Sequence, residues 1–207
     1  MTKLTYVKAI GAALEPVGFE LRAGMSRNRE WVRFRDGFED CVDLQFRSIG
    51  GTTCNINTRD LATVDILEKA APQEDPGWHY AEYTRLGELV DGNDRWWRND
   101  PNGPAEMVAL IKIHGLPYFE SLRSLEAQAK QFGVDGDKHW RHVPSLLRLA
   151  VTLWRMGRGD EACVLLSNPP NGPISKPLPN WLARAEALKA WLGCEGAKIR
   201  RVDDGSY

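Results

Sequence analysis

Apolar and polar residues alternate at every second position in the first third of the chain, which is the pattern of half-buried β-strands. The alternation runs through residues 30–35, 38–47 and 52–58. Asp36-Gly37 separates the first two segments and is typical of a two-residue hairpin turn. Gly50-Gly51 provides a turn before the third segment. The pattern therefore predicts an antiparallel meander with one apolar face and one polar face.

The same alternation assigns each side chain of the predicted sheet to a face. The apolar face is expected to contain Val32, Phe34, Val42, Leu44, Phe46 and Ile56. The opposite face is expected to contain Trp31, Arg33, Arg35, Asp43, Gln45, Arg47, Asn55 and Asn57, with Tyr83 and Arg85 from a further strand predicted over residues 81–89. A shift of one residue in the pairing register would exchange the two faces of a strand.

Apolar residues at helical spacing predict helices on both sides of this region. The first covers residues 3–14 and ends at Glu15-Pro16. Further helices are predicted over residues 105–114, 118–132, 144–156, 160–166 and 181–192, and a short helix over 61–70 is left open. We therefore expect an α+β fold. An antiparallel sheet of about four or five strands packs against helices in residues 1–133, and an all-helical extension follows over residues 134–207.

Composition narrows the class of protein. The chain has 207 residues, of which 43% are hydrophobic, and its 27 Lys+Arg and 28 Asp+Glu give a net charge of −1. These values exclude an intrinsically disordered chain. The chain also lacks the excess of basic residues that is typical of a nucleic-acid-binding protein. No run of about 18 apolar residues predicts a membrane span. The four cysteines are far apart and the first residues do not resemble a signal peptide, so a cytoplasmic protein with reduced thiols is expected.

Candidate catalytic and metal-binding motifs are weak. His139 and His142 have a spacing that suits one helix face, but no third ligand is in register, and a surface or packing role is preferred. Residues 91–103 begin like a calcium loop, yet Arg95 and Trp96 stand where an oxygen ligand and a glycine are required. No nucleophile, phosphate-loop or zinc-protease motif occurs. We therefore expect no catalytic residue, no metal and no cofactor.

Five short segments carry a family resemblance. They are LEPVGFE, VDLQFRS, TTCNINT, YTRLGELVDGNDRWW and HGLPYFESLRSLE, within residues 3–127. In this order and spacing they resemble a bacterial family known as domain of unknown function 4304. That family has no established activity, so the resemblance implies an α+β fold with an antiparallel sheet and no reaction. It also implies that the positions to watch are Gln45, Asn55, Arg85, Asp94, Trp96 and Trp97.

The polar face of the predicted sheet is the candidate recognition surface. Arginine, aromatic and amide side chains together are typical of surfaces that bind proteins or anions. The plainer interpretation is a solvated face, or one covered by the C-terminal helices. Of the adjacent residues Trp96 and Trp97, one is expected in the core and the other exposed as a binding anchor, unless both pack at the end of the sheet. The hypothetical binding residues are Trp31, Arg33, Gln45, Arg47, Asn55, Asn57, Tyr83, Arg85, Asp94, Trp96 and Trp97.

These observations favour a non-enzymatic cytoplasmic binding protein that recognises a protein partner, for example in an immunity- or antitoxin-like role. The role is an analogy with other small bacterial α+β domains. The alternative is an enzyme or small-ligand binder whose anionic substrate is held by Arg33, Arg47 and Arg85. Neither a membrane nor a nucleic acid is expected as a partner.

Overall fold

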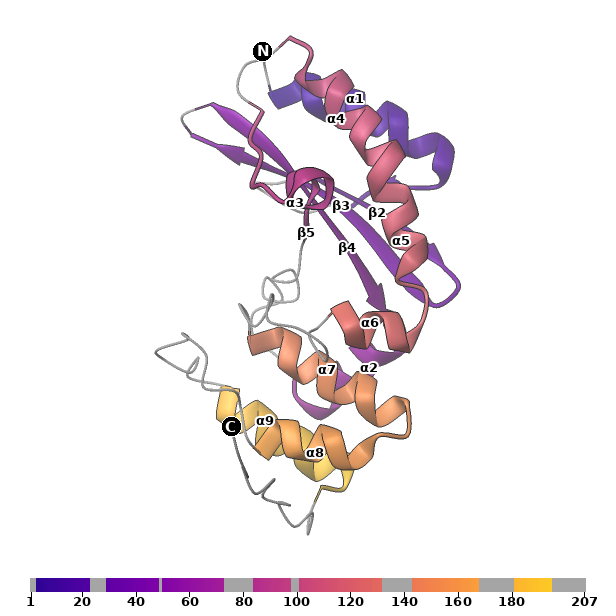
Figure 1. The fold of residues 1–207 in the computed structure, drawn as a ribbon, viewed down its shortest axis with the longest axis vertical. Coiled ribbons are helices and arrows are strands. Elements are labelled where there is room, and N and C mark those ends of the chain that lie inside the picture. The colour runs from indigo at the N-terminus through magenta and orange to yellow at the C-terminus, as the bar shows by residue number, and fades with distance from the viewer. Residues whose placement is uncertain are drawn as a thin grey trace, which may run out of the picture. The chain divides into compact units, whose positions relative to one another are not determined.

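The computed structural model of the chain describes residues 3–22, 29–48, 50–72, 84–97, 101–131, 143–167 and 181–194. The chain forms two compact units (Figure 1). An α+β unit contains residues 1–62 and 82–127, and a helical unit contains residues 63–81 and 128–207. The sequence placed only residues 134–207 in the helical part, whereas the chain enters the helical unit twice.

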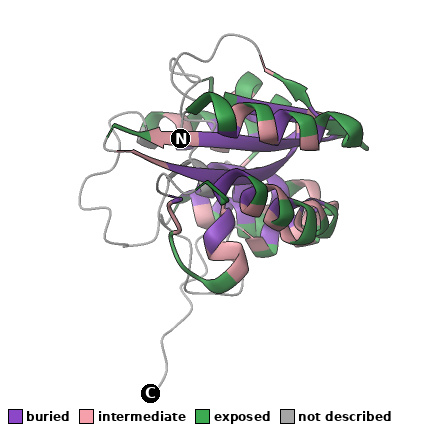
Figure 2. Cartoon of the chain, turned by 90° about the horizontal axis from the view of Figure 1, so that it is seen from above, coloured by how far each residue is buried: buried purple, intermediate pink, exposed green. Residues whose placement is uncertain are grey.

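A five-stranded antiparallel sheet forms the centre of the α+β unit, with the strands in sequence order. The strands are β1 (Glu20–Leu21), β2 (Arg29–Arg35), β3 (Phe38–Arg47), β4 (Gly51–Asp60) and β5 (Thr84–Arg85). The expected α+β fold with an antiparallel sheet is confirmed. Figure 2 shows that the central strands are largely buried, although they carry many polar residues.

The turn between β2 and β3 fixes their pairing register. Asp36 and Gly37 have φ angles of 52° and 80°. Positive φ at both central residues is what a two-residue type I′ hairpin turn requires. Arg35 therefore pairs with Phe38, and the odd-numbered residues of β2 share a face with the even-numbered residues of β3.

This register contradicts the predicted faces of β2. Trp31, Arg33 and Arg35 lie on the apolar face of the sheet, and Trp31 is only 2% exposed. Val32 and Phe34 lie on the polar face instead, where Phe34 is 63% exposed. The prediction was wrong because the turn, and not the hydrophobicity of the side chains, sets the register.

Helices of the α+β unit cover the apolar face (Figure 1). These helices are α1 (Lys3–Leu14), α4 (Gly103–Leu110) and α5 (Leu116–Ser121), with a 3-10 turn, η1 (Glu15–Val17), after α1. A π-helical turn, η3 (Ile111–Gly115), joins α4 to α5 without a gap. The single helix predicted over residues 118–132 was wrong, because the chain leaves the helix at residues 122–124 and a separate helix begins at Leu125. The core contains Ile10, Leu14, Val42, Leu44, Ile56, Met107 and Phe119, each at most 1% exposed.

The last strand is shorter than predicted. Strand β5 ends at Arg85, and residues Leu86–Asp91 form helix α3 instead of continuing the strand. The Glu88 carboxylate accepts a hydrogen bond from the Arg85 backbone N–H (3.3 Å), which stabilises the start of the helix. Leu86 is fully buried in the core from this helix.

The helical unit is built around one apolar cluster, which includes Leu67, Ala150 and Leu188. Its helices are α2 (Leu61–Ala70), α6 (Leu125–Gln131), α7 (Val143–Arg155), α8 (Gly159–Ser167) and α9 (Trp181–Leu192), of which α2 and α6 begin in the α+β unit. The last three lie close to their predicted bounds. Among the described helices, none has both the length and the apolar character to cross a membrane.

A disulfide joins α8 to the end of α9 in this unit, between Cys163 and Cys194. The expectation that all the thiols are reduced was therefore wrong for this pair. Cys41 and Cys54 are buried and take no part in this disulfide. Disulfides persist mainly in oxidising environments. Reduced thiols therefore no longer provide an argument for a cytoplasmic location.

Candidate functional site

The polar face of the sheet lies opposite the helices of the α+β unit. It contains Glu30, Val32, Phe34, Glu39, Cys41, Asp43, Gln45, Arg47, Thr53, Asn55, Asn57, Arg59 and Arg85. The expectation that Gln45, Arg47, Asn55, Asn57 and Arg85 share this face is confirmed, since Asn55 pairs with Arg85. Tyr83 lies outside the described residues.

Internal ion pairs occupy one end of the polar face. Arg22 contacts Glu39 at 2.7 Å and Glu30 at 3.4 Å, and Arg59 also contacts Glu39. The Cys41 thiol donates to Glu30 Oε1 at 2.9 Å. Both carboxylates are at most 5% exposed. This end of the face therefore pairs its charges within the chain.

Asp43 lies at the middle of the face and is only 5% exposed. Burial raises the pKa of Asp43 from 3.8 to about 6, although the hydrogen bond from Asn55 Nδ2 (2.9 Å) lowers this pKa and the nearby Glu30 raises it. Asn55 stands between Asp43 on β3 and Arg85 on β5. A carboxyl group that titrates near pH 6 thus lies in one row with an arginine.

The two adjacent tryptophans have different environments. Thr52 and Trp97 form an antiparallel bridge, which places Trp97 in the core at 4% exposure. The Trp97 indole donates to Glu106 at 2.9 Å. Trp96 is partly exposed and lies over Gly51, where an added Cβ would be 3.5 Å from the Trp96 ring. The expectation that one of the two rings lies in the core is confirmed for Trp97, whereas the role of Trp96 as an exposed binding anchor stays a prediction.

Two arginines of the polar face contact the Trp96 ring. The Cζ atom lies 3.5 Å from the ring centroid for Arg47 and 5.1 Å for Arg85. The carboxylate of Asp94, which is 45% exposed, pairs with Arg85 Nε at 3.2 Å. Arg47 is exposed and has no carboxylate partner within the part of the chain that the structure describes. We call Arg47, Arg85, Asp94 and Trp96 the Trp96 cluster.

The Trp96 cluster also contains donors that lack an acceptor. Arg85 Nη1 and Trp96 Nε1 are buried and form no hydrogen bond with any described residue. Buried donors in folded proteins are nearly always paired, and leaving one unpaired costs about 1–3 kcal/mol. The cluster therefore holds two buried donors without an acceptor, and the exposed Arg47 guanidinium lies on the same aromatic ring.

A close backbone approach positions this cluster. Gly87 in α3 lies against the backbone of residues 93–95, directly before Trp96. A Cβ atom at Gly87 would be 2.6 Å from the Asn93 carbonyl oxygen and 2.8 Å from the Arg95 nitrogen. The Thr53 hydroxyl donates to the Arg95 carbonyl at 2.8 Å. No local pattern in the sequence predicts a role for Thr53, because this contact joins segments that are far apart along the chain.

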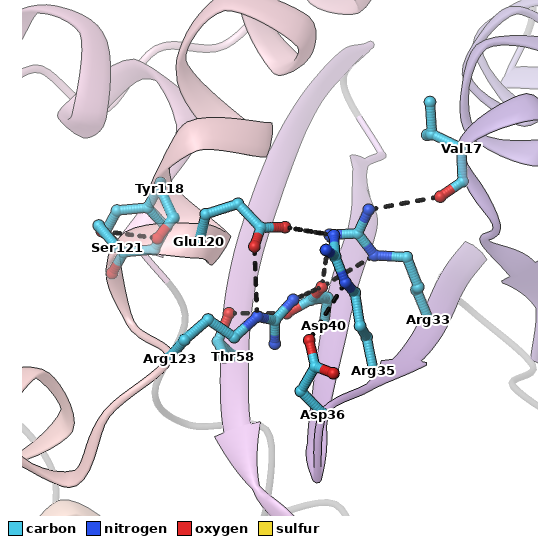
Figure 3. A network of polar contacts seen from close by, with 10 residues as sticks. All are labelled: Val17, Arg33, Arg35, Asp36, Asp40, Thr58, Tyr118, Glu120, Ser121 and Arg123. Atoms are coloured by element: carbon cyan, nitrogen blue, oxygen red, sulfur yellow. Dashed lines mark hydrogen bonds and ion pairs between the residues drawn. The ribbon is translucent and has the colours of Figure 1, made fainter.

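Arg33 has a different environment from the one predicted (Figure 3). It donates to the fully buried Asp40 through Nε (3.0 Å) and Nη2 (2.7 Å). Arg123 donates to the same carboxylate, and Glu120 accepts from Arg33 and from Arg35 at 3.2 Å. This network lies on the helix-covered face, so the predicted grip of one anion by Arg33 together with the two polar-face arginines was wrong.

Three other predicted binding residues, Trp31, Asn55 and Asn57, are buried. Trp31 is 2% exposed and packs beside α1, where a Cβ at Gly11 would lie 3.5 Å from its Nε1 atom. Asn57 shares the polar face but is 6% exposed. Trp31 therefore belongs to the core, and the exposed part of the candidate surface is the Trp96 cluster with Gln45 beside it.

The described residues contain no group of three side chains suited to hold a metal ion, and His139 and His142 lie outside them. Comparisons with protein families, curated proteins and solved structures found no match to this chain. The resemblance to the domain of unknown function 4304 family therefore stays a prediction.

Proposed function

We propose that this chain is a binding module that recognises a protein partner through the Trp96 cluster and takes no catalytic part. The stacking of the exposed Arg47 on the partly exposed Trp96 carries this proposal. Tryptophan and arginine are the residue types most enriched where protein interfaces gain their binding energy. The stacked guanidinium is also held in one position before binding, which lowers the entropy cost of forming an interface.

Capture of partners from the cell of origin tests the proposal. Trp96→Ala should lose a partner that the wild-type protein recovers, because the anchor of the interface is removed. Ile113→Ala is the matched control, since Ile113 is 63% exposed on η3 and its loss also removes an exposed apolar side chain. Recovery of the same partners with all three proteins would refute the proposal. An immunity-like role predicts in addition that the recovered partner is toxic when expressed alone.

A second candidate function is binding or conversion of a small anionic molecule. The observation that favours it is Asp43, whose pKa of about 6 suits proton transfer near neutral pH and whose neighbour Asn55 pairs with Arg85. This candidate predicts that Asp43→Asn abolishes turnover of the small molecule and leaves partner capture unchanged. Loss of partner capture without any small-molecule activity favours the protein-binding function.

A further inference from the structure

We infer that the Trp96 cluster binds a carboxylate group from an acidic segment of its partner, an inference that rests on the proposed protein-binding function. The starting observation is the unpaired donors. Arg85 Nη1 and Trp96 Nε1 have no acceptor among the described residues, and Arg47 has no carboxylate there. An oxyanion is the chemical group that pairs all three donor types.

Both arginines border the same aromatic ring. The Cζ atoms of Arg47 and Arg85 lie 3.5 Å and 5.1 Å from the centroid of the Trp96 ring. A guanidinium presents its N–H groups as a planar fork that matches the two oxygens of a carboxylate. Arg47 is the exposed member, so an incoming carboxylate meets it first.

Asp94 acts as an internal competitor for the same arginine. Its carboxylate contacts Arg85 Nε and leaves Nη1 unpaired. The side chain of Asp94 is 45% exposed. Exposed ion pairs of this kind contribute little stability, so a second carboxylate can compete for Arg85.

Charge on the polar face favours an acidic protein segment over a nucleic acid. The cluster itself has two arginines and one aspartate, which suits a single negative group. A nucleic acid needs cations along several phosphates. Arg22 and Arg59, which contact the rest of this face, already pair with Glu39 and so do not extend the positive charge of the cluster.

The test follows the Trp96 indole N–H signal in a nitrogen-15 spectrum of tryptophan-labelled protein, titrated with hexaglutamate. Trp96→Phe assigns the signal by its disappearance. We expect hexaglutamate to shift this signal, and Arg47→Gln and Arg85→Gln each to weaken binding by about tenfold, because each removes a charge-assisted hydrogen bond. Lys8→Gln, which removes one exposed positive charge from α1, is the control and should leave binding unchanged.

Asp94→Asn gives a result that misfolding cannot produce. Loss of the competing carboxylate should strengthen hexaglutamate binding by about twofold to fivefold, in line with the value of an exposed ion pair. Unchanged or weaker binding by Asp94→Asn would overturn the inference. Tighter binding of inorganic phosphate or of a short single-stranded DNA than of hexaglutamate would overturn it as well.

The outcomes separate this inference from the proposed function. If hexaglutamate leaves the Trp96 signal unmoved while Trp96→Ala still loses its protein partner, the carboxylate inference fails and the protein-binding function stands. If hexaglutamate binds at Trp96 while Trp96→Ala keeps every partner, the protein-binding function fails.

Discussion

Asp40→Asn should strongly destabilise the α+β unit. Asp40 is fully buried and accepts hydrogen bonds from Arg33 Nε and Nη2, from Arg123 and from the Thr58 hydroxyl. Removing one partner of a buried ion pair costs about 3–5 kcal/mol, since the remaining charge is left without compensation. Glu120 still contacts both arginines in the variant, so the lower end, about 3 kcal/mol, is expected.

Glu120→Gln is the matched comparison. It removes the same charge from the same network (Figure 3), but the Glu120 side chain is 45% exposed. Its loss should therefore cost less than about 1 kcal/mol. Urea unfolding followed by circular dichroism gives both free energies of unfolding, and the difference should fall on the transition of the α+β unit. Equally small losses in the free energy of unfolding of the two variants would show that burial of the carboxylate does not determine how much it contributes to stability.

Three further predictions concern other parts of the chain. In the folded wild type the pKa of Asp43 is raised from 3.8 to about 6, so the free energy of unfolding falls as the pH rises from about 4 to 6. Asparagine does not ionise, so Asp43→Asn should raise the free energy of unfolding at pH 7 by up to about 3 kcal/mol. The gain should vanish below about pH 4 in urea titrations, and an equal gain at both pH values would contradict the shifted pKa. Replacing Cys163 and Cys194 by serine should destabilise the helical unit by about 3.7 kcal/mol, the loop-entropy value for a separation of 31 residues. Thiol titration of the unfolded wild type should find the two free cysteines before reduction and all four after it, and four at the start would rule out the disulfide. Gly87→Ala should displace the segment before Trp96 and move the Trp96 indole signal without any ligand, whereas an unchanged spectrum would contradict the close backbone approach at Gly87.

The central strands could be predicted because alternation and burial agree there. Val42, Leu44 and Ile56 stand at every second position and are fully buried. The faces of β2 could have been predicted as well, since the Asp36-Gly37 turn alone requires Arg35 to pair with Phe38. Hydrophobicity misled the assignment because three of the four residues from Trp31 to Phe34 are apolar, so either register places apolar side chains inward.

The candidate site could be predicted only in part. Arg47 and Arg85 follow from alternation on two strands, and their common face was predicted. Their contact with Trp96 depends on the chain folding back against the first residues of β4, where Thr52 pairs with Trp97. The close approach at Gly87 and the Thr53 hydroxyl hold this arrangement. Such contacts join residues far apart in sequence, and no local period encodes them. Helix α3 was missed because the Glu88 carboxylate stabilises a helix start within a strand-like pattern.

The helical unit is built from two separate segments, residues 63–81 and 128–207, and the first is synthesised long before the second. Helix α2 is synthesised early, while α7, α8 and α9 come last. Leu67 and Ala71 are 7% and 1% exposed in the finished chain, and they belong to the apolar cluster that those late helices complete. The nascent chain therefore presents these side chains to solvent, or to a chaperone, for most of its elongation. If translation stopped after the α+β unit, Leu67 of α2 would stay exposed to solvent, because the helices that bury it would be absent.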